Sequence, residues 1–172
     1  MTARKPNSAH RKKARRLALQ ALYQWHVAEA PVTQIEKEFL TENDLSKFDS
    51  EYFSEVLRGV PASKSELDKH ITQHTSRGVD EMTAIELAIL RMGTYELIHR
   101  IDVPYKVIIN EGVELSKTFG ANEAHRFVNG VLDKFYLFFK NCRCTHRFTP
   151  IFGKQRGING LRTAPLWSHG FR

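Results

Sequence analysis

The chain has 172 residues, 41% of them hydrophobic, which is enough for one domain with a real core or for two small subdomains that share one. Its net charge of +7 is uneven: positions 1–16 and 141–172 carry seven and six basic residues and no acidic one, while 17–140 has 13 basic and 19 acidic residues, hence −6. No apolar run is long enough for a membrane span or is placed like a secretory signal, so we expect a cytoplasmic protein.

The first predicted helix runs from about Ser8 to Ala28, behind a basic arm at 1–8, with Asn7 or Ser8 as its cap. Small and aromatic residues recur at helical spacing and predict a buried stripe: Ala14, Ala18, Ala21 and Trp25.

The opening turns of this helix carry a cluster of cations, although the helix dipole favours anions there. Arg11 with Arg15, and Lys12 with Arg16, are like-charge pairs at i,i+4, each costing about 0.2–0.5 kcal/mol. A polyanion laid across these turns would relieve both penalties, which favours nucleic-acid binding. The alternative is a solubilising basic tail.

The remaining periodicity is helical almost throughout, and no alternating strand pattern of useful length appears. The helix at about 83–99 is apolar on nearly every side and should lie at the centre of a bundle. We therefore predict an all-α fold, a compact bundle of about seven helices. The further helices are expected at 33–42, at 49–58 with Gly59 as C-cap, after Ser63, from Pro104 to Phe119 with Gly120 as a left-handed cap, and from near Asn122 to about Lys140.

Beyond position 140 the pattern changes. Positions 141–172 contain four glycines, scattered aromatic residues and six cations, with neither helical nor strand periodicity. We expect this basic tail to be poorly ordered.

No phosphate-binding loop, dinucleotide fingerprint, zinc-protease motif or nucleophile motif is present, so we predict no catalytic residue and no cofactor. Three sets of residues have metal-compatible spacing, but each is more simply a solvated surface or an incomplete motif, and we predict no metal site. They are Glu111 with Glu114, His70 with His74, and Cys142-x-Cys144-x-His146.

Aromatic residues alternate with cations late in the body, at Phe119 and at Arg126-Phe127. Two phenylalanines are more often ordinary core residues. However, aromatic rings also stack on unpaired bases, worth about 1–3 kcal/mol per base. The loop at 119–123 leads into a helix N-terminus, which suits an anion, so this region is a candidate second contact surface.

Three segments together resemble the NusB family of bacterial transcription antitermination factors, over about residues 9–140. The middle of the chain fits as well, at Glu86, Leu90-Arg91 and Tyr95-Glu96-Leu97. The three segments are Arg11-Lys12-Lys13-Ala14-Arg15 continuing to Gln20-Ala21-Leu22-Tyr23; Asp102-Val103-Pro104-Tyr105-Lys106-Val107 with Ile109-Asn110-Glu111; and Phe127-Val128-Asn129-Gly130-Val131-Leu132-Asp133-Lys134.

The resemblance implies two three-helix subdomains that bind the boxA element of ribosomal RNA leaders as single-stranded RNA. The implied partner is the ribosomal protein NusE, inside an antitermination complex on RNA polymerase, and the acidic body suits a basic partner. A homodimer that hides the basic helix is left open. The implied RNA face comprises Arg11, Lys12, Lys13, Arg15, Arg16, Phe119, Glu123, Arg126 and Phe127, and the implied partner face comprises Tyr23, Glu81, Glu86 and Arg91.

Two features depart from the family pattern: Gly112, which should weaken its helix by about 1 kcal/mol relative to alanine, and the tail at 141–172. Two other functions stay open. The same fold occurs as the N-terminal domain of some ribosomal RNA cytosine methyltransferases, so the chain could be a fragment of such an enzyme. It could also be a scaffold that binds only protein.

Overall fold

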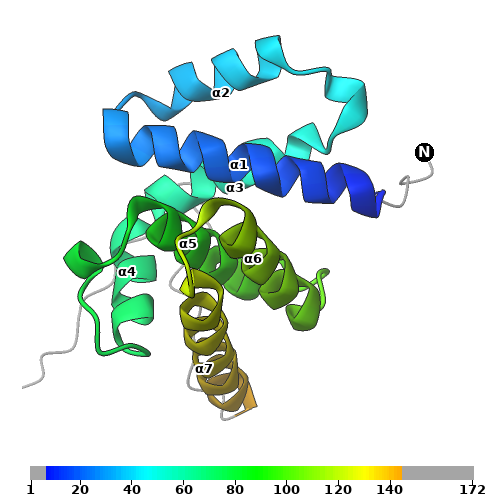
Figure 1. Cartoon of the computed structure of the whole chain (residues 1–172). Coiled ribbons are helices and arrows are strands. Elements are labelled where there is room, and N and C mark those ends of the chain that lie inside the picture. Colours follow the sequence, from blue (N-terminus) through cyan, green and yellow to red (C-terminus); the bar gives the residue numbers. More distant parts are fainter. Residues whose placement is uncertain (1–6, 145–172) are drawn as a thin grey trace, which may run out of the picture.

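The computed structural model describes residues 7–144, and within them the only regular elements are helices. This confirms the predicted all-α class (Figure 1). Most of the predicted N-terminal arm and of the basic tail lies outside the described residues. The elements are α1 (Ser8–Ala28), α2 (Val32–Glu42), η1 (Leu45–Lys47), α3 (Ser50–Ala62), α4 (Lys64–Thr72), η2 (Val79–Glu81), α5 (Ala84–His99), α6 (Tyr105–Phe119) and α7 (Ala124–Cys144).

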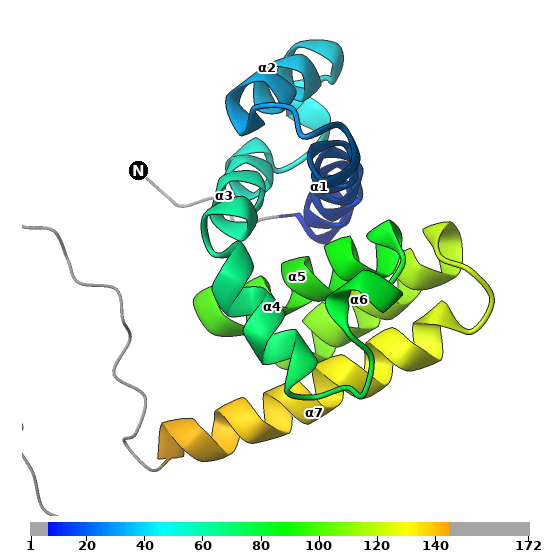
Figure 2. The same cartoon turned by 90° about the vertical axis from the view of Figure 1, so that its left-hand side faces the viewer.

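The helices form two layers, and α5 of the second layer also packs against the first. Helices α1, α2 and α3 make one three-helix subdomain, and α5, α6 and α7 make the other, with α4 beside α5 (Figures 1 and 2). Every residue from position 86 to 97 is buried, because α5 contacts α1, α3, α4, α6 and α7. The prediction that this apolar helix lies at the centre is therefore confirmed. None of the helices in residues 7–144 has the length and apolarity needed to cross a membrane.

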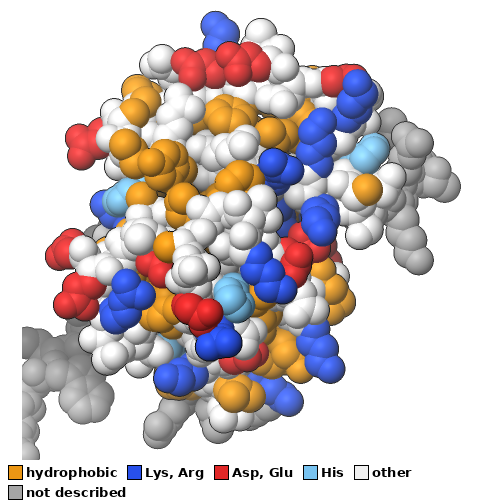
Figure 3. Space-filling view, viewed as in Figure 1, with side chains coloured by type: hydrophobic (Ala, Val, Ile, Leu, Met, Phe, Trp, Pro, Cys, Tyr) orange, Lys and Arg blue, Asp and Glu red, His pale blue; other side chains and the backbone are white. Residues whose placement is uncertain are grey.

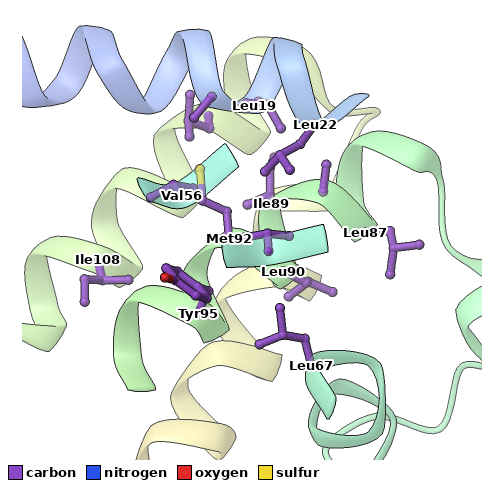
Figure 4. Close-up of a cluster of buried hydrophobic side chains, with 14 of the residues drawn as sticks. Leu19, Leu22, Val56, Leu67, Leu87, Ile89, Leu90, Met92, Tyr95 and Ile108 are labelled. Atoms are coloured by element: carbon purple, nitrogen blue, oxygen red, sulfur yellow. The ribbon is translucent and has the colours of Figure 1, made fainter. Parts of the chain in front are cut away.

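Side chains from both subdomains meet on α5. Leu19 and Leu22 of α1 point toward Ile89 and Met92 of α5, as Figure 4 shows, and all four are nearly inaccessible to solvent. Leu67 of α4 closes the other side of α5. Burying such side chains contributes about 1.5–3 kcal/mol each, so the two subdomains fold as one core.

Side-chain hydrogen bonds cap the N-termini of α1 and α5, at residues whose types favour capping. The Asn7 side chain accepts a hydrogen bond from the backbone N–H of Ala9 (3.1 Å) and starts α1 at Ser8, as predicted. Thr83 and Glu86 form a reciprocal capping box at the start of α5, with donor–acceptor distances of 2.9 and 3.2 Å.

Three glycines have roles other than those predicted. The third helix continues through Gly59 to Ala62, and a Cβ atom at position 59 would overlap the Tyr95 ring. Gly120 has an extended backbone (φ −84°) rather than a left-handed one, and a Cβ there would lie 2.5 Å from the Ser116 carbonyl oxygen. Gly112 is buried where α6 crosses α7, so the absent side chain permits a close approach. Gly59 and Gly112 depend on contacts with other helices, whereas Gly120 depends on the last turn of α6 and the start of α7.

A pair of glycine substitutions tests this interpretation. A methyl group added at Gly130, inside α7, would meet no atom within 4 Å apart from its chain neighbours and the backbone of its own helix, so Gly130→Ala should raise the free energy of unfolding by about 0.5–1 kcal/mol. Gly59→Ala should lower it by about 1–3 kcal/mol, because Tyr95 must move. Urea denaturation measures both. A stabilising Gly59→Ala would contradict a close-packing role.

His70 of α4 and His74 of the turn after it are partly buried rather than exposed as expected. The His70 ring lies 5.4 Å from the Phe135 ring, and His74 contacts both Phe135 and Phe138 of α7. The His74 Nδ1 is 2.7 Å from the His70 carbonyl oxygen. These rings therefore pack α4 and the turn after it against α7.

Burial lowers the pKa of His70, and also those of His26 and His99. A histidine whose pKa is lower in the folded state binds its proton more readily in the unfolded state. Its contribution to the free energy of unfolding is therefore fully present above pH 6.5 and is lost as the pH falls. We expect a lower free energy of unfolding at pH 5.5 than at pH 7.5, measured by urea titration. A His70→Gln variant should show a smaller difference, and an equal one would contradict the assignment to His70.

Candidate nucleic-acid interface

The cations of α1 fall on two faces of the helix. Arg11 and Arg15 point toward α3 and α5 and are largely removed from solvent. On the other face Lys12 and Arg16 are exposed and Lys13 is half-buried. The five cations of the implied RNA face therefore lie on two separate surfaces of α1.

Arg15 makes a buried ion pair with Glu96 of α5. Its Nη2 donates to Oε1 at 2.8 Å and its Nε to the same carboxylate at 3.1 and 3.2 Å, with the two side chains only 3% and 1% exposed. Burial lowers the pKa of Arg15, but the charge and hydrogen bonds of Glu96 outweigh it and raise the pKa above its ordinary value. This corrects the expectation that Arg15 offers its charge to a ligand, since the guanidinium is committed to an internal partner.

Arg11 is also paired internally. Its Nε donates to Asp49 at 2.9 Å, and its Nη1 lies 3.6 Å from Asp102. The like-charge penalty predicted for Arg11 and Arg15 is therefore relieved by carboxylates of the protein, without a polyanion. Asp49 also caps α3 through the backbone N–H of Tyr52.

Three guanidinium groups surround the buried ring of Tyr52. The Cζ atoms of Arg11, Arg15 and Arg100 lie 5.0, 5.2 and 5.4 Å from its centroid. Arg100 is held in turn by Asp102 and Glu55, at 2.8 and 2.7 Å. Cation–π contacts and ion pairs thus fix the N-terminal half of α1 against α3 and the end of α5.

The outer cations line a groove of about 490 Å³ between α1 and α6. Cationic side chains gather over the N-terminal half of α1 in Figure 3. The Arg16 guanidinium lies 5.1 Å above the Phe119 ring at the end of α6. This arrangement presents positive charge beside a partly exposed aromatic ring. The groove is lined by Ala9, Lys12, Lys13, Arg16, Leu17, Gln20, Glu111, Glu114, Leu115, Thr118 and Phe119.

The second predicted contact surface is divided as well. Phe119 belongs to the α1–α6 groove, whereas Phe127 is covered by Arg77, whose Cζ is 4.5 Å from the ring centroid. Glu123 and Arg126 form an exposed ion pair at 2.8 Å at the start of α7, where Glu123 has a left-handed backbone (φ 68°). Arg77 gave no sequence signal, because its partner lies 50 positions further on.

The predicted partner face is only partly exposed. Tyr23 is 43% exposed on α1, and Glu81 is exposed while accepting from the backbone N–H of Gly78. Glu86 is buried in its capping box. Arg91 is 2% exposed and bound to Asp68 at 2.7 and 2.8 Å. Of the four residues of the implied partner face, Tyr23 and Glu81 are therefore exposed, whereas Glu86 and Arg91 are buried.

Metal-compatible residues do not converge within residues 7–144, where no group of three or more candidate ligands is found. Of the short cysteine motif, the side chains of Cys144 and His146 lie outside the described residues.

These features define an all-helical protein with a cationic groove suited to a polyanion. The NusB family model matches residues 12–137, and the chain belongs to the NusB family. It is 54% identical over 133 residues to the transcription antitermination protein NusB of Pseudomonas putida (strain GB-1), covering 77% of this chain and 80% of the relative. It is also 54% identical to that of Idiomarina loihiensis over 126 residues, 73% of this chain and 91% of the relative.

Solved structures agree with this assignment. A crystal structure of the antitermination factors NusB and NusE in complex with double-stranded RNA matches with a TM-score of 0.68 and 27% identity, over 77% of this chain and 99% of the other. NusB of T. maritima matches with a TM-score of 0.65 and 25% identity, over 73% and 89%.

Removing one member of the buried ion pair tests its structural role. Glu96→Gln leaves the Arg15 charge buried without a counter-charge and should lower the free energy of unfolding by about 3–5 kcal/mol. The double variant Arg15→Met, Glu96→Leu should recover much of this loss, because both charges are gone. Urea denaturation of the three proteins measures it. A Glu96→Gln protein as stable as the parent would contradict the account.

Proposed function

We propose that this chain is a non-catalytic, RNA-binding transcription antitermination factor. In this proposal it binds single-stranded boxA RNA of ribosomal RNA leaders together with NusE, in a complex on RNA polymerase in the bacterial cytoplasm. Family membership and the antitermination names of its relatives support this class. The row of outward-facing cations on α1 beside Phe119 is the observation that indicates where the RNA binds.

The proposed RNA surface is narrower than the one the sequence suggested. Lys12, Lys13 and Arg16 contact phosphates and Phe119 offers a ring for stacking, while Arg11 and Arg15 hold the helix in place. Glu123 and Arg126, exposed at the start of α7, and Phe127 beneath Arg77 form a separate second contact in this proposal, outside the α1–α6 groove.

For NusE we propose the surface around Tyr23 and Glu81, both exposed, with Glu86 and Arg91 shaping it from beneath. The net charge of −6 over positions 17–140 favours a basic partner. The methyltransferase-domain alternative is not favoured, because the relatives described above are antitermination proteins and the chain covers 80% and 91% of their lengths.

Charge reversal on the outer face tests the RNA site. Lys12→Glu with Arg16→Glu should weaken binding of labelled boxA RNA at least about tenfold and reduce the slope of log affinity against log salt by about 1.4, at 0.7 per phosphate contact. Fluorescence anisotropy measures binding, and circular dichroism should show unchanged helicity. Lys37→Glu, at an exposed position of α2, reverses a single charge away from the groove and should have little effect.

Unchanged RNA affinity in the double variant would refute this site. Repeating the titration with and without NusE, on single-stranded and double-stranded RNA, separates the alternatives. If RNA binds neither the free protein nor its complex with NusE, the protein-only scaffold is favoured. Sedimentation of the free protein shows whether a homodimer competes for the same surface.

A further inference from the structure

The groove between α1 and α6 has two rims of opposite charge. The α1 rim carries Lys12, Lys13 and Arg16, and the α6 rim carries Glu111 and Glu114. Phosphate contacts explain the first rim but not the second, because carboxylates repel a sugar-phosphate backbone. The acidic rim therefore suits a ligand group that donates hydrogen bonds.

The two carboxylates differ in their surroundings. Glu114 accepts from Lys117 at 2.8 Å, which lowers its pKa and keeps it ionised at neutral pH. Glu111 is half-buried, and its carboxylate accepts no hydrogen bond and forms no ion pair within residues 7–144, although the Arg15 charge lies near enough to interact with it. A partly desolvated carboxylate with unused lone pairs is an acceptor suited to N–H donors of a ligand.

The floor of the groove suits a flat ring. Leu17 and Leu115 are less than a tenth exposed, and Phe119 is partly exposed beneath the Arg16 guanidinium. The volume of about 490 Å³ falls within the range of about 300–1,000 Å³ typical of small-ligand sites. A planar base can pack against this floor while its attached phosphates reach the α1 rim.

We propose that this groove holds one unpaired nucleobase that carries an exocyclic amino group, with Glu111 accepting the amino N–H. The inference rests on the proposed function and adds base selectivity to it. The acidic rim then distinguishes cytosine from uracil, two pyrimidines of nearly the same shape. The cytosine N4 amino group donates to a carboxylate, whereas the uracil O4 is an acceptor and is repelled by it.

The experiment compares 12-nucleotide oligocytidine and oligouridine by fluorescence anisotropy at low ionic strength, using the full chain. The parent protein should bind oligocytidine about 5- to 10-fold more tightly. In Glu111→Gln this ratio should fall to about 1, with oligouridine binding gained, because the glutamine amide can donate to O4. Glu42→Gln, at the exposed end of α2, removes the same charge away from the groove and should leave the ratio unchanged.

The possible outcomes separate this inference from the proposed function. If both oligomers bind with equal affinity to the parent, or if Glu111→Gln keeps the parent ratio, base selection by this groove is overturned while RNA binding stands. If neither oligomer binds the parent protein, the proposed function fails and the inference fails with it. A uniform rise in affinity for both oligomers in Glu111→Gln, without a change in ratio, would show that the residue acts only through its charge and also overturns the inference.

Discussion

A buried ion pair between the first helix and the central one fixes how α1 faces the solvent. Removing Arg15 and Glu96 from water costs several kcal/mol per ion, and the bidentate geometry and the Tyr52 ring offset this cost. Because the pair and the Arg11–Asp49 contact lie on one side of the helix, α1 can take only one rotation about its axis. The opposite side, with Lys12 and Arg16, is thereby turned outward.

One run of basic residues thus serves two purposes. The inner arginines are neutralised by carboxylates of the protein and hold α1 against α3 and α5. The outer cations remain available and share a groove with the aromatic end of α6 and with two glutamates. A net positive charge alone would bind any polyanion. The acidic rim across the groove gives this surface a means to select what lies between the two helices.

Local signals were sufficient for most helices. The 3.6-residue period and the Asn7 cap placed α1 at Ser8–Ala28 from sequence, and the absence of a polar face placed α5 at the centre. The errors came from long-range contacts. Glu96 is 81 positions from Arg15, and Gly59 resembles a C-cap locally although its neighbour Tyr95 lies in another helix. A signal for the inner arginines did exist, since Arg11 and Arg15 continue the helical stripe of the buried residues Ala18 and Leu22.

The division of the α1 cations can be observed directly through the side-chain Nε–H resonances of the arginines, recorded by NMR with and without single-stranded boxA RNA. We predict that the Arg16 resonance shifts on RNA binding, whereas the Arg15 resonance is protected from exchange in the free protein and stays in place. An Arg15 resonance that exchanges freely without RNA and shifts on binding, with Arg16 unaffected, would contradict the account.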